Sequence, residues 1–268
     1  MSKQKRMGQI LDLLAEKQEV SVQELVDTLG ISPATARRDL DGLAEQQLLT
    51  RTRGGAMAHA IAFDLPVRYR DQRNAPQKAV IAHAVSAMIP HGSIIGLSGG
   101  TTTTAVAEAL MARPDVLEST GTPSLTVVTI GVNIATQLAM RPQIRTVIAG
   151  GVVNPRSYEA IGPYAEAVIK GVTLDYAIVG TDGIDEVHGA TSQDDHEAQV
   201  TKLMMSRAAK TILVADSAKF DRRAFATVGG PEEFEMVVTD RGISEDQLER
   251  FTRRGFAIKI ADSPTAPA

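Results

Sequence analysis

Two helices with strong capping signals follow one another near the start of the chain. Ser21 opens the first helix, Glu24 stands three residues later in the spacing of a capping box, and Gly30 ends it. Ser32 opens the second helix, directly before a proline that suits a first helical turn. Another helix with an apolar stripe is predicted at residues 3–17. A helix followed by two capped helices across a short turn is the pattern of a helix-turn-helix, and it constrains the fold more than any other feature.

The last of these three helices has one apolar face. Ala36, Leu40 and Leu43 recur at positions i, i+4 and i+7, which predicts that they are buried. In a helix-turn-helix this helix lies in the major groove, with its N-terminal residues near the base edges. The residues expected to contact DNA are Ser32, Ala34, Thr35, Arg37 and Arg38. Either arginine can pair with a guanine edge or neutralise a phosphate, and a capped three-helix unit with a solvated arginine pair is the alternative interpretation.

A short strand, a glycine turn and a return strand are predicted for residues 48–57. This hairpin would form a wing beside the helix-turn-helix. Arg51 and Arg53 lie on it, and Gly54 and Gly55 would let its tip approach a DNA backbone closely. We therefore expect both arginines of the wing to contact phosphates.

The formal net charge of −4 argues at first against a nucleic-acid partner. However, residues 1–60 hold eight basic and eight acidic side chains, so this segment is neutral and the remainder carries the −4. For DNA binding, the grouping of four arginines on the third helix and the hairpin matters more than the total. The total charge therefore neither supports nor excludes a nucleic-acid partner.

The sequence contains no cysteine, which excludes disulfides, zinc–thiolate sites and thiol nucleophiles. No apolar run approaches the roughly 20 residues that a membrane-spanning helix needs, and no signal-peptide core follows the polar residues at the start. We therefore expect a cytoplasmic protein without a membrane partner.

Four segments are predicted along the chain. A winged helix-turn-helix domain is expected at residues 1–57, followed by a basic linker at 58–76 that prolines interrupt. An α/β domain is expected at residues 77–261 and a disordered tail at 262–268. Helical stretches alternate with short apolar strands in the α/β domain, which predicts a mainly parallel sheet. The strand candidates are Ser93–Leu97, Leu125–Thr129, Thr146–Ala149, Asp175–Val179, Thr211–Ala215, Met236–Thr239 and Ala257–Ile260.

One loop of the α/β domain has the composition of an anion site. Residues 93–106 predict a strand, a polar glycine loop and a helix, so backbone N–H groups and threonine hydroxyls can surround an anion. The expected ligand contacts are Ser98, Gly99, Gly100, Thr101, Thr102 and Thr103. Gly150 and Gly151, which follow another strand, are a second candidate loop. The alternative for both is a plain turn, capped by threonine in the first.

A second group of polar residues follows other predicted strands or begins helices. Asp182, Glu197 and Lys219 are expected to meet at the carboxyl edge of the sheet, where ligands of α/β proteins bind. A helix cap or a solvated surface group is the alternative for each carboxylate. His188 and His196 lie near these residues without a compact ligand spacing, so neither a metal nor a cofactor is expected.

The N-terminal motifs closely resemble the signature of DeoR-type bacterial transcriptional regulators. In that signature, V-S-x-x-T-I-R-R-D-L is followed by R-x-H-G-G-A, and the matching stretches here are residues 31–40 and 51–56. Two positions depart from it: Ala36 replaces a bulky aliphatic residue, and Arg53 replaces the histidine. The first change loosens helix packing slightly, and the second makes the wing more basic.

Residues 77–260 resemble the effector domain of the same family, which is similar in fold to ribose-5-phosphate isomerase A. The stretches SGGTTT, GTDGID and ADSAKF carry this resemblance, together with Glu197. The isomerase begins its acidic run one residue earlier, where this chain has Val179, and its catalytic lysine loop has no counterpart between Glu186 and Thr201. An isomerase needs such groups beside its base, so ligand binding without turnover is expected.

Together these features predict a DNA-binding transcriptional regulator rather than an enzyme. The family resemblance implies a repressor of carbohydrate-utilisation genes, controlled by a phosphorylated sugar that binds the C-terminal domain. Its partners would be double-stranded operator DNA and further copies of the chain, as a dimer or a tetramer, because paired half-sites require a two-fold partner. The alternative is an enzyme of the sugar-phosphate isomerase type with an N-terminal interaction module.

Overall fold

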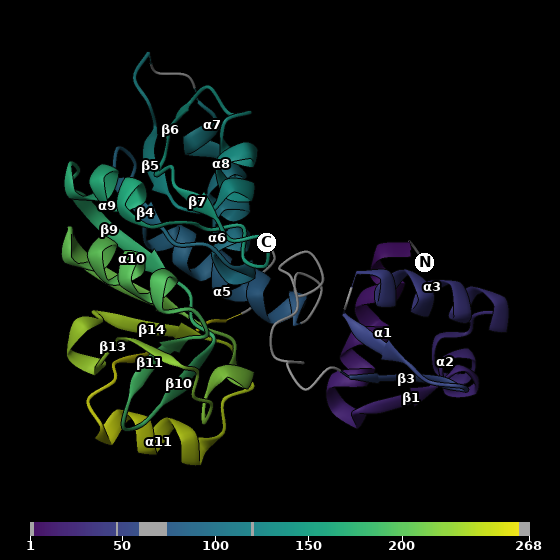
Figure 1. The fold of residues 1–268 in the computed structure, drawn as a ribbon. Coiled ribbons are helices and arrows are strands. Elements are labelled where there is room, and N and C mark those ends of the chain that lie inside the picture. The colour runs from purple at the N-terminus through teal and green to yellow at the C-terminus, as the bar shows by residue number, and fades with distance from the viewer. Residues whose placement is uncertain (1–2, 47, 59–73, 119–120, 263–268) are drawn as a thin grey trace, which may run out of the picture. The chain divides into compact units, whose positions relative to one another are not determined.

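The computed structural model describes residues 3–46, 48–58, 74–118 and 121–262. The chain forms two compact units (Figure 1), which are called here the N-terminal unit (Met1–Arg73) and the C-terminal unit (Asn74–Ala268). Most of the predicted linker at 58–76 lies outside the described residues, as does all but the first residue of the predicted tail at 262–268.

The N-terminal unit is a winged helix-turn-helix, as predicted. Its three strands form an antiparallel sheet of order β1-β3-β2, in which Val20 lies opposite Ala56, and Ala56 lies opposite Arg51. The strands β2 and β3 are the two arms of the predicted wing. The elements are α1 (Lys3–Lys17), β1 (Glu19–Ser21), α2 (Val22–Leu29), α3 (Pro33–Glu45), β2 (Leu49–Arg51) and β3 (Gly55–Ala58).

The core of this unit confirms the predicted inward face of α3. Ala36, Leu40 and Leu43 are fully buried, among apolar side chains from the other two helices and the sheet. An ion pair that the sequence pattern did not reveal lies beside them: Nη2 of Arg6 donates to Oδ1 of Asp39 at 3.1 Å, and Asp39 is 1% exposed. The hydrogen bond to Asp39 also raises the pKa of Arg6. This pair fastens α1 to α3.

Both predicted N-caps are present, although one is only half of a capping box. Ser21 accepts a hydrogen bond from the backbone N–H of Glu24 at 3.0 Å. The carboxylate of Glu24 binds the ammonium of Lys17 instead of completing the box. Ser32 caps α3 by accepting from the backbone N–H of Thr35 at 3.2 Å. These caps fix where α2 and α3 begin, and so set the turn between them.

The C-terminal unit is built around a sheet of seven strands that are all paired in parallel, in the order β15-β14-β12-β9-β4-β5-β6. All seven predicted strand candidates are strands of this sheet. Its elements are α5 (Ala75–Met88), β4 (Ile94–Leu97), α6 (Thr101–Met111), α7 (Pro114–Leu117), β5 (Leu125–Thr129), α8 (Val132–Leu138), β6 (Ile144–Ile148), α9 (Pro163–Lys170), β9 (Leu174–Val179), α10 (Asp195–Ser206), β12 (Ala208–Val214), η1 (Ser217–Lys219), η2 (Pro231–Glu233), β14 (Met236–Thr239), α11 (Glu245–Arg253) and β15 (Ile258–Ile260).

The strand order reverses in the middle of this sheet. From β4 the chain adds β5 and β6 on one side, and then crosses to add β9, β12, β14 and β15 on the other. The junction of β4 and β9 is therefore a topological switch point. In open α/β sheets, ligands bind at such a point, beyond the carboxyl ends of the strands.

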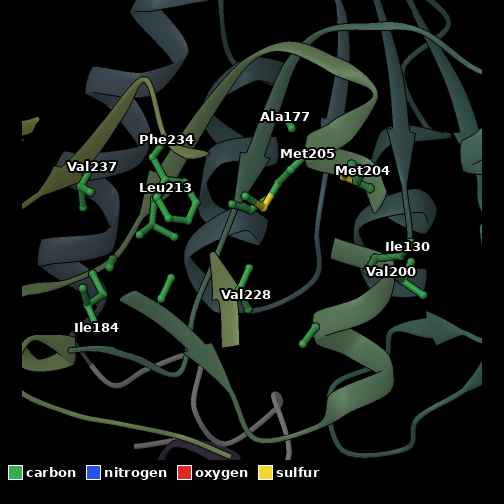
Figure 2. Close-up of a cluster of buried hydrophobic side chains, with 14 of the residues drawn as sticks. Ile130, Ala177, Ile184, Val200, Met204, Met205, Leu213, Val228, Phe234 and Val237 are labelled. Atoms are coloured by element: carbon green, nitrogen blue, oxygen red, sulfur yellow. The ribbon is translucent and has the colours of Figure 1, made fainter. Parts of the chain in front are cut away.

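Two small sheets were not predicted from the sequence. One is the hairpin of β7 (Val152–Val153) and β8 (Ala160–Ile161), and the other joins β10 (Gly183–Asp185), β11 (Gly189–Ser192) and β13 (Ala226–Gly229) in antiparallel order. The three-stranded sheet helps to enclose an apolar core to which α10 contributes Met204 and Met205 (Figure 2). These strands are only two to four residues long, so they show too little periodicity for recognition.

Candidate functional site

The exposed side of α3 carries the residues that were predicted to contact DNA. Arg37 and Arg38 are exposed, and neither guanidinium forms an ion pair or hydrogen bond within the described part of the chain. Ser32 and Ala34 are also exposed, whereas Thr35 is half-buried with its hydroxyl 2.9 Å from that of Ser32. The result is a basic surface with short side chains at the N-terminal end of the helix, the geometry that suits a major groove.

The two arginines of the wing have different surroundings. Nε of Arg51 donates to Oδ1 of Asp41 at 2.8 Å, and its Nη1 atom donates to the backbone oxygen of Gly55. Arg51 thus joins the wing to α3. Arg53 is exposed, and its guanidinium has no bonding partner among the residues that the structure covers.

In and directly after the anion loop (residues 98–103), some threonine hydroxyls bond to the backbone and one does not. The Thr103 hydroxyl donates to the backbone oxygen of Gly99 at 2.6 Å, and the Thr104 hydroxyl donates to that of Gly100 at 2.7 Å. Gly100 has a φ of 102°, which favours glycine. The hydroxyl of Thr102 bonds to no described residue, although the side chain is only 8% exposed. This hydroxyl and the first backbone N–H groups of α6 are the groups that the sequence assigns to an anion.

The loops after β4 and β9 are joined at the switch point. Ser98 accepts a hydrogen bond from the backbone N–H of Gly180 at 3.0 Å. Two residues further on, Asp182 accepts from the N–H of Gln193 at 3.0 Å, and its Oδ1 atom lies 3.9 Å from Nζ of Lys219. Sheet topology thus places three of the predicted site residues, from three neighbouring strands, at one edge.

Glu197 is buried at the start of α10, and two side chains of the β7–β8 segment donate hydrogen bonds to it. Its Oε1 atom accepts from Nδ2 of Asn154 at 2.9 Å and from the hydroxyl of Ser157. The side chain of Asp194 caps the helix by accepting from the backbone N–H of Glu197 at 3.1 Å. The carboxylate is therefore fixed in position by the segment between β7 and β8.

This segment also supplies a carboxylate to the anion loop. The β7–β8 hairpin folds over the end of β5, where the backbone N–H of Ala160 donates to the oxygen of Ile130 at 2.8 Å. Glu159 is 7% exposed, and a β-carbon at Gly99 would lie 2.3 Å from its Cγ atom. Only glycine lets this side chain pack against the loop, so an anion in the loop would lie close to a carboxyl group.

Asn154, Ser157 and Glu159 were not among the predicted site residues. The Asn-Pro dipeptide at residues 154–155 is a turn signal. It gives no information about the carboxylate that the turn would reach, because Glu197 lies 43 residues from Asn154 along the chain.

The second candidate loop lies apart from the switch point, after the edge strand β6. Gly150 has open space around it. A β-carbon at Gly151 would lie 2.4 Å from the backbone oxygen of Ile161, so this glycine is needed for the close approach of β8. Packing of the hairpin that holds Glu197 is therefore a sufficient reason for a glycine at position 151.

No group of three or more His, Cys, Asp or Glu side chains in the described residues is placed to hold a metal ion. His188 contacts Asp185 at 2.7 Å from its Nδ1 atom, as part of the β10–β11 hairpin. Among the same residues, no helix combines the length and the apolar character required to cross a membrane.

Two protein-family models match the chain. The model described as "DeoR-like helix-turn-helix domain" matches residues 6–61, and the one described as "DeoR C terminal sensor domain" matches residues 73–241. The two matches together take in both candidate sites.

Curated relatives cover most of the chain. The glycerol-3-phosphate regulon repressor of Escherichia coli (strain K12) is 32% identical over 240 residues, which are 90% of this chain and 92% of that protein. The repressor of the same name from Haemophilus influenzae is 34% identical over 239 residues, or 89% of this chain and 90% of that one. The transcriptional repressor CsqR of Escherichia coli is 31% identical, with coverages of 88% and 87%.

Solved structures resemble the chain more distantly. Ribose 5-phosphate isomerase A from Methanocaldococcus jannaschii has a TM-score of 0.40 at 18% identity, covering 55% of each chain. The translation initiation factor eIF-2B from Pyrococcus horikoshii has a TM-score of 0.43 at 14% identity, covering 83% of this chain and 74% of the other. Likeness at this level carries no information on activity.

Proposed function

Since the chain belongs to the DeoR family of DNA-binding transcriptional regulators, we propose that a phosphorylated sugar binds its C-terminal unit and controls the operator occupancy of its N-terminal unit. The curated relatives described above are named as repressors, two of them of a glycerol-3-phosphate regulon. A repressor of carbohydrate-utilisation genes is the function that these names support best.

The observation that carries the proposal is the pairing of two loops at the switch point of the parallel sheet. The anion loop follows β4, and the loop with Asp182 follows β9, the neighbouring strand. Ser98 and Gly180 bond across this junction. Ligands in sheets of this kind bind where the strand order reverses, so the anion loop has the expected position as well as the expected composition.

Each part of such a ligand has a chemical counterpart. A phosphate would accept hydrogen bonds from Thr102 and from the backbone N–H groups of the first turn of α6. Lys219 would contribute positive charge. Carboxylates accept hydrogen bonds from sugar hydroxyls, and Asp182 and Glu197 supply them near the loop.

Binding without turnover is favoured for Glu197, the candidate base of an isomerase. Two donors, Asn154 and Ser157, bond to one oxygen of its carboxylate. An isomerase also needs further catalytic groups beside its base, and the sequence has no lysine between Glu186 and Thr201. The role of Glu197 in the proposal is to hold a ligand hydroxyl or the β7–β8 hairpin, without proton transfer.

The DNA contacts are proposed to come from α3 and the tip of the wing. Arg37 and Arg38 would enter the major groove together with Ala34 and Thr35, and Arg53 would contact a phosphate. Because Arg51 bonds within the unit, its proposed role is to hold the wing in place beside α3.

A homo-oligomer is part of the same proposal. Regulators with a helix-turn-helix bind paired half-sites, one helical turn or multiples of it apart, and this requires a two-fold arrangement of chains. Light scattering of the full chain, with and without operator DNA, tests it. A monomer that binds a single half-site with full affinity would contradict this part.

Thermal unfolding in the presence of small ligands tests the effector. A ligand at 100 times its Kd stabilises the folded chain by about 2.7 kcal/mol. Stabilisation is expected from glycerol 3-phosphate or ribose 5-phosphate, and none from glycerol or ribose. Thr102→Asp puts a negative charge into the anion loop and should abolish this stabilisation. Thr102→Val should weaken the stabilisation. Thr136→Asp on the exposed side of α8 is the control.

Two results would count against the effector proposal. One is stabilisation by an uncharged sugar alone, at the same concentration. The other is full stabilisation of the Thr102→Asp variant by a phosphorylated sugar, which would place the phosphate elsewhere.

A further inference from the structure

We propose that a hydrogen bond between Asn74 and Asp216 couples the ligand site to the point where the chain enters the C-terminal unit. The inference rests on the proposed function, since it assigns a route by which that site acts on DNA binding. Nδ2 of Asn74 donates to Oδ1 of Asp216 at 3.0 Å, across 142 positions of the sequence. Asn74 is the first residue of the unit, and the chain before it leads to the helix-turn-helix.

Asn74 has an unusual conformation for its position. It is the N-cap residue of α5, with φ 53° and ψ 32° in the left-handed region, and its side chain makes no capping hydrogen bond. An asparagine at an N-cap ordinarily has extended backbone angles and accepts a bond from the first turn of its helix. Here the side chain forgoes that local bond and reaches a distant loop. The geometry thus serves a tertiary contact rather than the start of the helix.

Asp216 is the residue that sets the short helix after β12. It is 3% exposed, and the oxygen that binds Asn74 also accepts from the backbone N–H of Ala218 at 3.1 Å. The backbone N–H of Lys219 donates to the backbone oxygen of Asp216 at 2.9 Å. One carboxylate oxygen therefore holds both the entry residue of the unit and the turn that carries Lys219.

The other end of this turn faces the proposed ligand. Nζ of Lys219 lies 3.9 Å from Oδ1 of Asp182, at the end of β9. The turn is also anchored to the strand beside it, because Ser217 donates from its backbone N–H to Oδ1 of Asp240 at 2.7 Å. An anion that draws Lys219 away from Asp182 would pull on a turn that is also attached to Asp240, after β14, and to Asn74 at the chain entry.

The two attachments differ in what they can transmit. Asp240 follows β14 and is 6% exposed, so it belongs to the rigid frame. Asn74 has the helix α5 on one side and the segment toward the N-terminal unit on the other. In this proposal, a shift of Asp216 is passed through the hydrogen bond to Asn74, the residue at which the chain enters the unit. Coupling between sites is reciprocal, so DNA binding is also expected to change the conformation of the turn.

Hydrogen exchange of the full chain tests this coupling without a known effector. The amides of Ala218 and Lys219 are followed with and without an operator selected from random-sequence DNA. In the wild type, DNA is expected to change their exchange rates about fivefold or more, the lower end of typical coupling between sites. Asn74→Gly removes the side chain but keeps a residue that adopts the left-handed conformation freely, and it should abolish the change.

Two variants separate coupling from simple loosening. Ser217→Ala removes the bond from the Ser217 hydroxyl to Asp240, at 3.0 Å, and leaves Asn74 in place. In this variant, the amides of Ala218 and Lys219 should exchange faster both with and without DNA, but DNA should still change their exchange rates. The double variant Asn74→Asp, Asp216→Asn exchanges donor and acceptor and should recover part of the response. An unchanged exchange rate in the wild type on DNA binding, or a full response in Asn74→Gly, would overturn the proposal.

The outcome is independent of the proposed effector. If no phosphorylated sugar stabilises the chain but DNA changes the exchange of Ala218, the coupling stands and the ligand assignment fails. If a phosphorylated sugar binds but DNA leaves the turn unaffected, the ligand site stands and the route through Asn74 fails.

Discussion

The proposed DNA-binding surface takes its residues from one short stretch of the chain, whereas the proposed ligand site is assembled from distant ones. Arg37 and Arg38 lie on α3, and Arg53 lies in the turn between β2 and β3. In the C-terminal unit, the bonds that shape the site join residues 40, 43 and 82 positions apart. A surface made from one capped helix follows from local rules, while a site made from several strand ends depends on the order of the strands.

Behind each proposed site, buried polar groups join elements that lie apart in the sequence. In the N-terminal unit, a charged partner, Arg6, neutralises the buried Asp39. In the C-terminal unit, the side chains of Asn154 and Ser157 donate to the buried Glu197. The first arrangement fixes two helices of a small core, and the second fixes a hairpin over the edge of a sheet.

The largest effect is expected from Asp39→Ala, which leaves Arg6 without its partner. Removing one member of a buried ion pair costs about 3–5 kcal/mol. The expected result is loss of hydrogen-exchange protection in α1 and α3 of the full chain, with the C-terminal unit unaffected. Asp41→Ala is the matched control, because Asp41 is an exposed residue of the same helix whose ion pair with Arg51 lies at the surface. Equal effects of the two variants would contradict the role of the buried pair.

The next largest effect is expected on operator affinity, from the exposed arginines of α3. Arg37→Ala and Arg38→Ala should each weaken binding to the selected operator by about 1–3 kcal/mol if the side chain contacts a base, and leave the fold intact. A base contact should relax preference at one position of the operator, whereas a phosphate contact should weaken all sequences alike. Arg241→Ala in the C-terminal unit is the control, since Arg241 is also exposed and its ion pair with Asp262 lies at the surface. Unchanged affinity in both variants at low salt would remove α3 from its proposed role.

The contrast between the units explains how far sequence reasoning reaches. The caps at Ser21 and Ser32 and the buried residues of α3 follow from spacing alone, as do the seven strands of the parallel sheet. The ion pair of Asp39 with Arg6 does not follow from spacing, because an acidic residue on a helix is usually solvated. Likewise, the strand ends predict that Asp182 and Lys219 converge. They give no sign of Glu159 or Ser157, which arrive through a hairpin with two-residue strands.

Two adjacent glycines test whether that hairpin shapes the ligand site. A β-carbon at Gly151 would meet the backbone oxygen of Ile161 at 2.4 Å, so Gly151→Ala must displace β8. Such overpacking costs about 1–3 kcal/mol and should also weaken binding of the phosphorylated sugar that stabilises the wild type. Gly150→Ala has open space and should change stability by less than about 0.5 kcal/mol. If Gly151→Ala bound the sugar with full affinity, the hairpin would have no part in the site.

The smallest effect, and the finest test of the local surface, separates the two arginines of the wing. Arg53 is exposed without an intramolecular partner in the described residues, so Arg53→Ala should flatten the dependence of operator affinity on salt by about 0.9 units of slope, the contribution of one phosphate. Arg51 bonds to Asp41 and to the backbone of Gly55, so Arg51→Ala should leave the slope unchanged and lower affinity only through a looser wing. The measurement is operator binding across a salt series for both variants. If the slope falls with Arg51→Ala and not with Arg53→Ala, the intramolecular bonds of Arg51 give way to a phosphate on DNA, and the wing binds in a conformation other than this one.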